Sequence, residues 1–209
     1  MLKKIFRFYS LPMYILVHPF NGFYNMKHQK EGTVKFALFN FFLVCLSVSI
    51  MNQYTSIRII DAHPAAGNSL WVFSTNTMVL LLFCISNWAV STITDGEGKF
   101  KEILMVCCYA MTPIVLTFVP VTILSNFLAE AESGFFFMIR TFALGYSVLL
   151  GFLGLVSIHN YTPSKAIITI FLTFVAVLVI VFLVALLISM VQLLLIFTRS
   201  VYTEITFRL

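Results

Sequence analysis

The feature that constrains this chain most is a run of 32 residues near its C-terminal end, Ala166 to Phe197, without a single charged side chain. With a helical rise of ~1.5 Å per residue, such a run is longer than the ~30 Å hydrocarbon core of a bilayer. A helix of this length crosses the membrane only if it tilts strongly or projects from it. The run therefore predicts a transmembrane helix.

The rest of the chain has the same apolar character. Of its 209 residues 60% are hydrophobic, and the mean hydropathy is +1.00, outside the range of soluble domains. No Pro/Ser-rich linker, low-complexity tract or repeat divides it, so we predict one all-α membrane domain. A requirement of ~20 largely apolar residues per span gives five transmembrane helices. They are residues 36–54, 70–93, 103–127, 134–158 and 166–197.

Residues 1–35 precede the spans and have an amphipathic pattern. The apolar stretch is too short for a secretory signal, and no small-residue cleavage site follows it. We predict a helix lying in the membrane interface, with an irregular tail as the alternative because Pro12 interrupts the pattern. The apolar face comprises Leu2, Ile5, Phe6, Tyr9, Met13 and Leu16, and the basic face comprises Lys3, Lys4 and Arg7.

The distribution of Lys and Arg predicts the orientation in the membrane. Six of these residues precede the first span, whereas the later loops contain few. By the positive-inside rule the N-terminus is cytoplasmic, and five spans then place the C-terminus outside. The net charge of +5 is explained by anionic lipid at the cytoplasmic surface. We therefore expect the lipid bilayer as a partner and no nucleic acid.

Residue sets that support catalysis are missing from the sequence. The five predicted spans contain no Asp or Glu, and no nucleophile or metalloprotease motif is present. Asp61 and His63 share an outer loop, where a solvated turn is favoured over a cation site. The four cysteines lie inside predicted spans without metal or redox spacing, which indicates packing residues. We expect no catalytic site, no metal and no cofactor.

A small charged island follows the second span, and a second polar loop follows the fourth. The favoured interpretation of the island is a wet cytoplasmic turn, with its glycines serving turn geometry and its charges serving solvation. The alternative is that both loops form a cytoplasmic docking surface. The candidate docking residues are Asp95, Gly96, Glu97, Gly98, Lys99, His159, Tyr161 and Lys165.

Small residues follow one side of the fourth span. They recur at helical spacing, so that another backbone can approach closely where lipid supplies no hydrophobic drive. This stripe predicts a helix-packing seam, either within the chain or between subunits. Its members are Ala143, Ser147, Gly151 and Gly154.

Three further residues interrupt the apolar spans. Pro113 and Pro120 each free a carbonyl group in the third span, as a static kink or, less favoured, as part of a transport path. Arg140 is a charge inside the fourth span. We favour a structural role for it, in which it extends towards water or pairs with Glu130 and Glu132, over contact with a substrate or lipid phosphate.

The order of several short motifs resembles bacterial members of the Yip family, five-span proteins named for Ypt-interacting proteins. The resemblance covers nearly the whole chain, and the order of the motifs is more specific than any one of them. The motifs are HPFNGF (18–23), DGEGKFKEIL (95–104), YAMTP (109–113), GY (145–146), HNYTPSKA (159–166) and YTEITFR (202–208).

The resemblance implies a non-enzymatic scaffold or accessory subunit of the bacterial cytoplasmic membrane. Eukaryotic relatives are non-enzymatic partners of small GTPases and of other membrane proteins, and they carry a longer cytoplasmic N-terminal region, whereas this chain has only about 35 residues there. For the compact bacterial form, the resemblance implies other membrane proteins as partners, including subunits of transporters such as ABC-type sugar importers. A small transporter or lipid-handling channel is the alternative.

Overall fold

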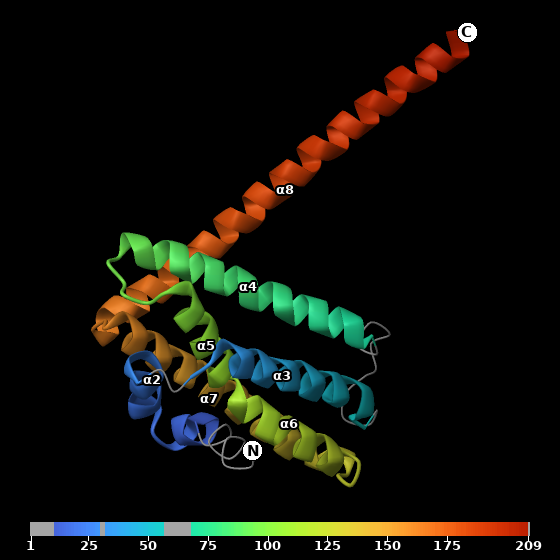
Figure 1. Cartoon of the computed structure of the whole chain (residues 1–209). Coiled ribbons are helices and arrows are strands. Elements are labelled where there is room, and N and C mark those ends of the chain that lie inside the picture. Colours follow the sequence, from blue (N-terminus) through green and yellow to red (C-terminus); the bar gives the residue numbers. More distant parts are fainter. Residues whose placement is uncertain (1–10, 30–31, 57–67, 209) are drawn as a thin grey trace.

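The computed structural model describes residues 11–29, 32–56 and 68–208, and the regular elements in these residues are helices (Figure 1). Five stretches are long and apolar enough to cross a membrane, which confirms the predicted polytopic bundle. They are α3 (Val34–Tyr54), α4 (Ser69–Ile93), the pair α5 (Phe100–Ala110) and α6 (Thr112–Ser125), α7 (Ser133–His159) and α8 (Pro163–Arg208).

The described part of the N-terminal segment is anchored in the bundle. Residues 11–17 are helical, and α2 (Pro19–His28) follows. Ile15 and Phe23 are fully buried in the core that α3, α4, α5 and α7 also form. Met13, on the predicted interfacial apolar face, is 41% exposed, whereas Leu16 on the same face packs partly buried against this core. The other four members of that predicted face, and its basic partner, lie in residues 1–10, outside the described residues.

The third span is broken into two helices. α5 ends at Ala110 and α6 begins at Thr112, immediately before Pro113, which has no backbone N–H to continue the helical bonding. The hydroxyl of Thr112 donates to the carbonyl of Tyr109 (2.6 Å), and the Asn40 amide donates to the carbonyl of Cys108 (2.7 Å). Side chains thus satisfy the carbonyls that the break exposes. Pro120, in contrast, lies inside α6 without ending it.

The bundle core lies between α3, α5, α6 and α7. Its larger part surrounds α5 and includes residues of α2 and α4, and a second part lies between α3, α6 and α7. All four cysteines are buried as free thiols, as expected for packing residues. They are Cys45, Cys84, Cys107 and Cys108.

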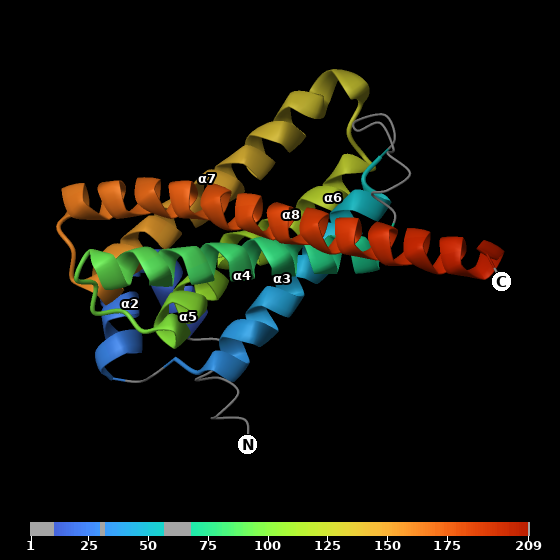
Figure 2. The same ribbon diagram turned by 90° about the horizontal axis from the view of Figure 1, so that it is seen from above.

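The last helix differs from the others because most of it lies outside the bundle. Its first half packs along α4, and its second half extends away from the other helices (Figures 1 and 2). Residues 181–207 are exposed around the whole helix. The predicted span ended at Phe197, but the helix continues to Arg208.

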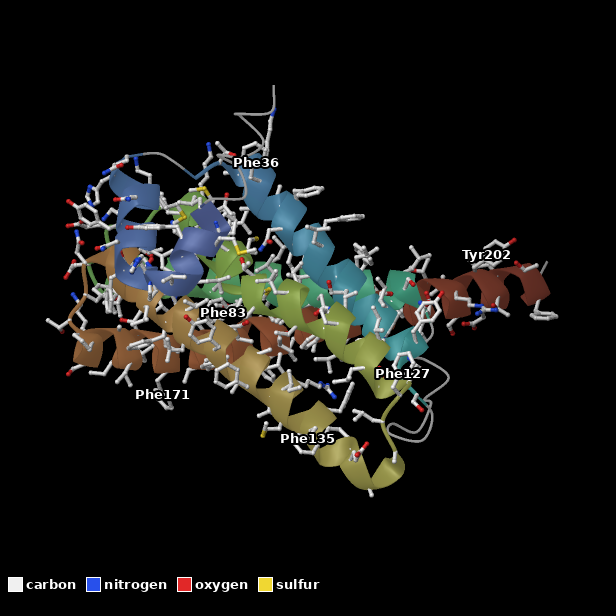
Figure 3. All side chains as sticks on the ribbon, turned by 90° about the horizontal axis from the view of Figure 1, so that it is seen from below. Phe36, Phe83, Phe127, Phe135, Phe171 and Tyr202 are labelled. Atoms are coloured by element: carbon white, nitrogen blue, oxygen red, sulfur yellow. The ribbon has the colours of Figure 1, made fainter. Side chains whose placement is uncertain are left out.

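The two ends of the bundle are formed by different loops. At one end, α2 lies beside the α4–α5 and α7–α8 loops, and we call this the loop end. At the other end, the Gln53 amide donates to Ser69 (2.6 Å), and the Asn126 amide donates to the carbonyl of Tyr54 (3.2 Å). Phe127 and Phe135 lie at the tip of the α6–α7 hairpin (Figure 3). Asp61 and His63, for which the sequence favours a solvated turn over a cation site, lie outside the described residues.

Candidate functional site

Most of the candidate docking residues gather in one polar cluster at the loop end. It joins segments that are far apart in the sequence, namely α2, the α4–α5 loop and the α7–α8 loop. Polar side chains from α4 and α8 also belong to it. We call this the loop cluster. Its members are Lys27, Asn87, Thr94, Gly96, Glu97, Gly98, His159, Asn160, Tyr161 and Thr173.

A lysine from α2 fastens the two loops together. Lys27 Nζ lies 2.8 Å from Glu97 Oε2 and donates a second bond to the carbonyl of Ile158, also at 2.8 Å. Asn160 adds a 2.6 Å amide hydrogen bond to the same carboxylate. The hydrogen bond from Lys27 and its positive charge lower the pKa of Glu97. Lys27 is largely buried, with 11% of its side chain exposed, whereas the Glu97 side chain is 59% exposed and borders water.

His159 is the buried centre of the loop cluster, with 2% of its surface exposed. The backbone N–H of Gly98 donates to its Nδ1 (3.2 Å), so the proton belongs on Nε2. Nε2 then donates to the Asn87 side-chain oxygen (3.4 Å), and the Asn87 amide donates to the Thr173 hydroxyl (3.1 Å). One imidazole therefore links α7 to α4 and, through Asn87, to α8.

Tyr161 covers the other side of the imidazole. Its ring stacks on His159 with the centroids 5.0 Å apart and the planes at 13°. Its hydroxyl lies 2.7 Å from the Thr94 hydroxyl at the end of α4, and Lys165 Nζ lies 4.8 Å from the ring centroid. At this distance the ammonium makes a cation–π contact. Tyr161 thus connects the two loops at a second point.

The two glycines of the island are required by these rings. A Cβ at Gly98 would lie 2.7 Å from Cε1 of His159, and one at Gly96 would lie 2.5 Å from its Nδ1. Neither glycine has a positive φ; the left-handed positions are Asp95 and Asn160, each with φ 53°. We expected the glycines to serve turn geometry. They serve close approach instead, and Asp and Asn occupy the left-handed positions that these residue types tolerate.

Charged side chains around the loop cluster face outwards. Asp95, Lys99 and Lys101 are exposed beside Glu97. The backbone N–H of Lys99 donates to Glu102 at 3.0 Å, which caps the start of α5. The glycines of the island are thus internal packing positions, and its exposed charges form part of the surface.

The small-residue stripe of α7 lies inside the chain. Ala143 is buried, and Ser147 donates to its carbonyl (2.9 Å). A Cβ on Gly151 would lie 3.8 Å from Ala110 of α5, whereas one on Gly154 would lie 2.5 Å from Val106 of α5. Ala143 thus packs in the core part shared with α3 and α6, and the glycines of the seam face α5, most closely at Gly154.

Among the described residues, the three intramembrane candidates do not share the cavity at the α5–α6 break. The cavity at the α5–α6 break is about 30 Å³ and is lined by Asn40, Tyr109 and Thr112 among others, but by none of Pro113, Pro120 and Arg140. Such a volume holds about one water molecule.

Arg140 does not form its expected pair with Glu132. The guanidinium belongs to a half-buried side chain on α7. The Glu132 carboxylate accepts instead from the backbone N–H of Ala129 (3.2 Å). The side chain of Glu130, the other expected partner, lies outside the described part of the chain.

Sequence reasoning missed five members of the loop cluster, and one of them is Thr94 at the end of α4. Lys27 entered only as one of six cations that set the orientation, although it is the ion-pair partner of Glu97. Asn87 and Thr173 are polar residues inside spans, and Asn160 stands directly beside His159. A carboxamide inside a span signals a buried hydrogen-bonding partner, and this signal was available at Asn87.

The side chains of the loop cluster join separate segments of the chain to one another. Within residues 11–29, 32–56 and 68–208, no group of three or more His, Cys, Asp or Glu side chains is arranged to hold a metal ion. The hydrogen bonds of Lys27, His159 and Tyr161 all run between separate segments. The arrangement therefore closes the loop end and presents charges on its outside.

Comparison with known proteins identifies the family. The family model of the Yip1 domain matches residues 13–197, which include the loop cluster, the seam, the first four spans and α8 up to residue 197. No curated protein and no solved structure matches the chain. The match to most of its length shows that this chain belongs to the Yip1 domain family, a family of multi-span membrane proteins that are generally not enzymes.

Proposed function

We propose that this chain is a non-enzymatic scaffold or accessory subunit that binds other membrane proteins within the bilayer. Membrane transport complexes, such as sugar importers of the ABC type, are the class of partner that the family resemblance suggests. The observation that carries the proposal is the second half of α8, a long apolar helix that its own bundle leaves uncovered.

The exposure of α8 is unusual among the five spans. Only 6% of an apolar 18-residue stretch of α8 is buried inside the chain, whereas the buried share of the corresponding stretch in the other spans ranges from 22% to 61%. Residues 181–207 extend for ~40 Å at ~1.5 Å per residue. Because the bundle uses none of this surface for its own packing, the whole of it is available to another transmembrane helix.

The loop end supplies a second surface, which we place in the cytoplasm. Lys27, Lys99, Lys101 and Lys165 all belong to this end, in agreement with the positive-inside rule. With five spans, the C-terminus of α8 then lies outside the cytoplasm. A partner that binds α8 in the bilayer therefore meets the charges around the loop cluster at the cytoplasmic surface.

Purification of the tagged chain in mild detergent, followed by mass spectrometry, tests this proposal. We expect a second membrane protein at stoichiometric yield. A charge-reversed variant, Lys99→Glu with Lys101→Glu, serves as the matched comparison because both side chains are exposed and the fold does not depend on them. It should recover less of the companion if the loop end contributes to binding. Recovery of the chain alone, with no companion, contradicts the proposal.

The break between α5 and α6 supports a second candidate function, a small transporter or lipid-handling channel. Broken helices line transport paths in many membrane proteins, and Arg140 is a half-buried charge in the neighbouring α7. The cavity of about 30 Å³ at the break argues against a passage in this conformation. Flux or lipid scrambling by the pure chain in liposomes, lost in Pro113→Ala, Pro120→Ala or Arg140→Gln, would favour this candidate over the scaffold.

A further inference from the structure

A carboxamide interrupts the exposed half of α8. Gln192 stands within the uncharged run, with five apolar residues between it and Thr198, and its side chain is exposed. Ser189, one turn earlier, is also exposed. Within the part of the chain that the structure describes, neither side chain forms a hydrogen bond with another residue.

A helix that tilts to keep the whole uncharged run inside the bilayer places this exposed carboxamide in hydrocarbon, which offers it neither a donor nor an acceptor. Removing an amide from water without a new hydrogen bond is unfavourable, and in membranes Gln side chains bond across pairs of helices instead. Gln192 therefore calls for a partner that brings a polar group to the same depth of the bilayer.

The position of Gln192 around the helix shows from which side the partner comes. Ala185, Ser189 and Gln192 follow one another at intervals of four and three residues, the spacing at which one helix packs along another. At ~100° per residue, this line lies roughly 140° around the helix from Thr169 and Thr173, the buried residues that face α4. The partner therefore lies outside this bundle. We call the line from Ala185 to Gln192 the α8 seam.

We propose that the α8 seam binds the α8 seam of a second copy of this chain. A carboxamide is both donor and acceptor, so Gln192 can bond to Gln192 of a second copy in both directions. Two copies with the same orientation in the membrane have parallel α8 helices, and two-fold symmetry then places both carboxamides at the same depth. A different protein would need its own polar group at that depth, whereas a second copy always has one.

The shape of the molecule leaves room for this pairing. The second half of α8 extends away from the other helices in Figure 1, and in Figure 2 its C-terminal end projects past the bundle. Two such halves can therefore align without contact between the bundles. Ala185 and Ser189 are small and permit close approach of the two backbones. Arg199 follows on the same side of the helix, where its long side chain can extend to water at the end of the apolar run.

Disulfide crosslinking of the full chain in liposomes tests the pairing. Ser189→Cys places a thiol on the seam, and Val191→Cys places one at nearly the same depth on the opposite side of the helix. The four native cysteines are buried, so the wild type serves as a background without crosslinking. Under a mild oxidant we expect a covalent dimer with Ser189→Cys and little with Val191→Cys. Adding Gln192→Leu to Ser189→Cys should weaken dimerisation roughly 10-fold.

The outcomes separate this inference from the proposed function on which it rests. No dimer, or equal crosslinking at both positions, overturns the pairing, since the latter indicates random collision. An unchanged dimer in the Gln192→Leu background also overturns it. Gln192 is exposed and makes no contact that holds the bundle, so loss of the dimer in this variant does not reflect misfolding. If the seam crosslinks only to another membrane protein in native membranes, the second copy is ruled out while the scaffold function stands.

Discussion

Replacing Gly98 with alanine tests whether the loop cluster holds the bundle together. The added Cβ would lie 2.7 Å from Cε1 and 2.9 Å from Nδ1 of His159, where a relaxed carbon contact needs ~3.5–4.0 Å. The ring cannot retreat freely, because it is 2% exposed, stacked on Tyr161 and bonded to Asn87. Since the φ of Gly98 is not positive, the backbone itself tolerates alanine, and the effect is purely steric.

The expected cost of Gly98→Ala has two parts. Overpacking of a well-filled site costs about 1–3 kcal/mol, and the loss of the Gly98 N–H bond to His159 costs about 1 kcal/mol. The sum is about 2–4 kcal/mol, which corresponds to a Tm lower by about 5–15 °C for a chain of this size. A thiol-reactive fluorophore can follow unfolding in detergent, because all four cysteines become accessible only when the bundle opens.

The matched control is Gly145→Ala, an alanine added in α7 where no other side chain lies within 4 Å of the new Cβ. It should leave the Tm unchanged or raise it slightly, because alanine is more favourable than glycine inside a helix by about 0.5–1 kcal/mol. His159→Ala should be destabilising alone, but combining it with Gly98→Ala should add little further loss because the clash has gone. Equal Tm values for Gly98→Ala and Gly145→Ala, or full additivity with His159→Ala, would refute this reasoning.

Three further outcomes follow from the same contacts. The lowered folded-state pKa of Glu97 means that its ion pair stabilises the chain fully above about pH 4.5 and less as the pH falls below it, so Glu97→Gln should remove this component from a Tm–pH series. Asn40→Leu should cost about 1–3 kcal/mol because it leaves a backbone carbonyl at the helix break unpaired. Ser49→Ala should cost less, because the buried hydroxyl that it removes has no partner among the described residues. Equal losses of stability in thermal unfolding would contradict this. Gly154→Ala should cost about 1–3 kcal/mol and Gly151→Ala almost nothing, because their added Cβ atoms would lie 2.5 Å and 3.8 Å from α5. The opposite order of stability losses would show that the seam is packed differently.

Hydropathy predicts the spans well because the cost of exposing apolar residues to water is local and additive along the chain. The predicted spans at 36–54, 70–93 and 134–158 match α3, α4 and α7 to within two residues at each end. The last helix continues past Phe197, where the predicted span ends, to Arg208. Its polar final turns retain helical hydrogen bonding after the hydropathy has fallen, and hydropathy does not report helix formation outside lipid.

Proline alone does not determine where a transmembrane helix breaks. Pro113 and Pro120 both lie in the third span and both remove a helical hydrogen bond. The chain breaks only before Pro113, where Thr112 and Asn40 bond to the carbonyls that are released. The second of these donors comes from α3, so the break depends on a tertiary contact that the local sequence does not contain.

The loop cluster depends on tertiary structure to a still greater degree. The sequence pointed to Glu97 and His159 as candidates in two separate loops. It did not reveal that Gly98 receives the ring of His159, because glycines in a charged turn also satisfy ordinary turn geometry. Nor did it assign Lys27 to Glu97, 70 residues away, since charge patterns specify partners only within a helical turn or two.

Accessibility of single cysteines at the two ends of the molecule tests the central claim most directly. Lys101→Cys labels the exposed rim of the loop cluster, and Thr203→Cys labels the last turns of α8, in a chain whose native thiols are buried. With a membrane-impermeant thiol reagent on intact cells, five spans with a cytoplasmic loop end predict labelling at residue 203 only, and labelling at residue 101 after the cells are opened. Labelling of both residues from the same side would contradict the account.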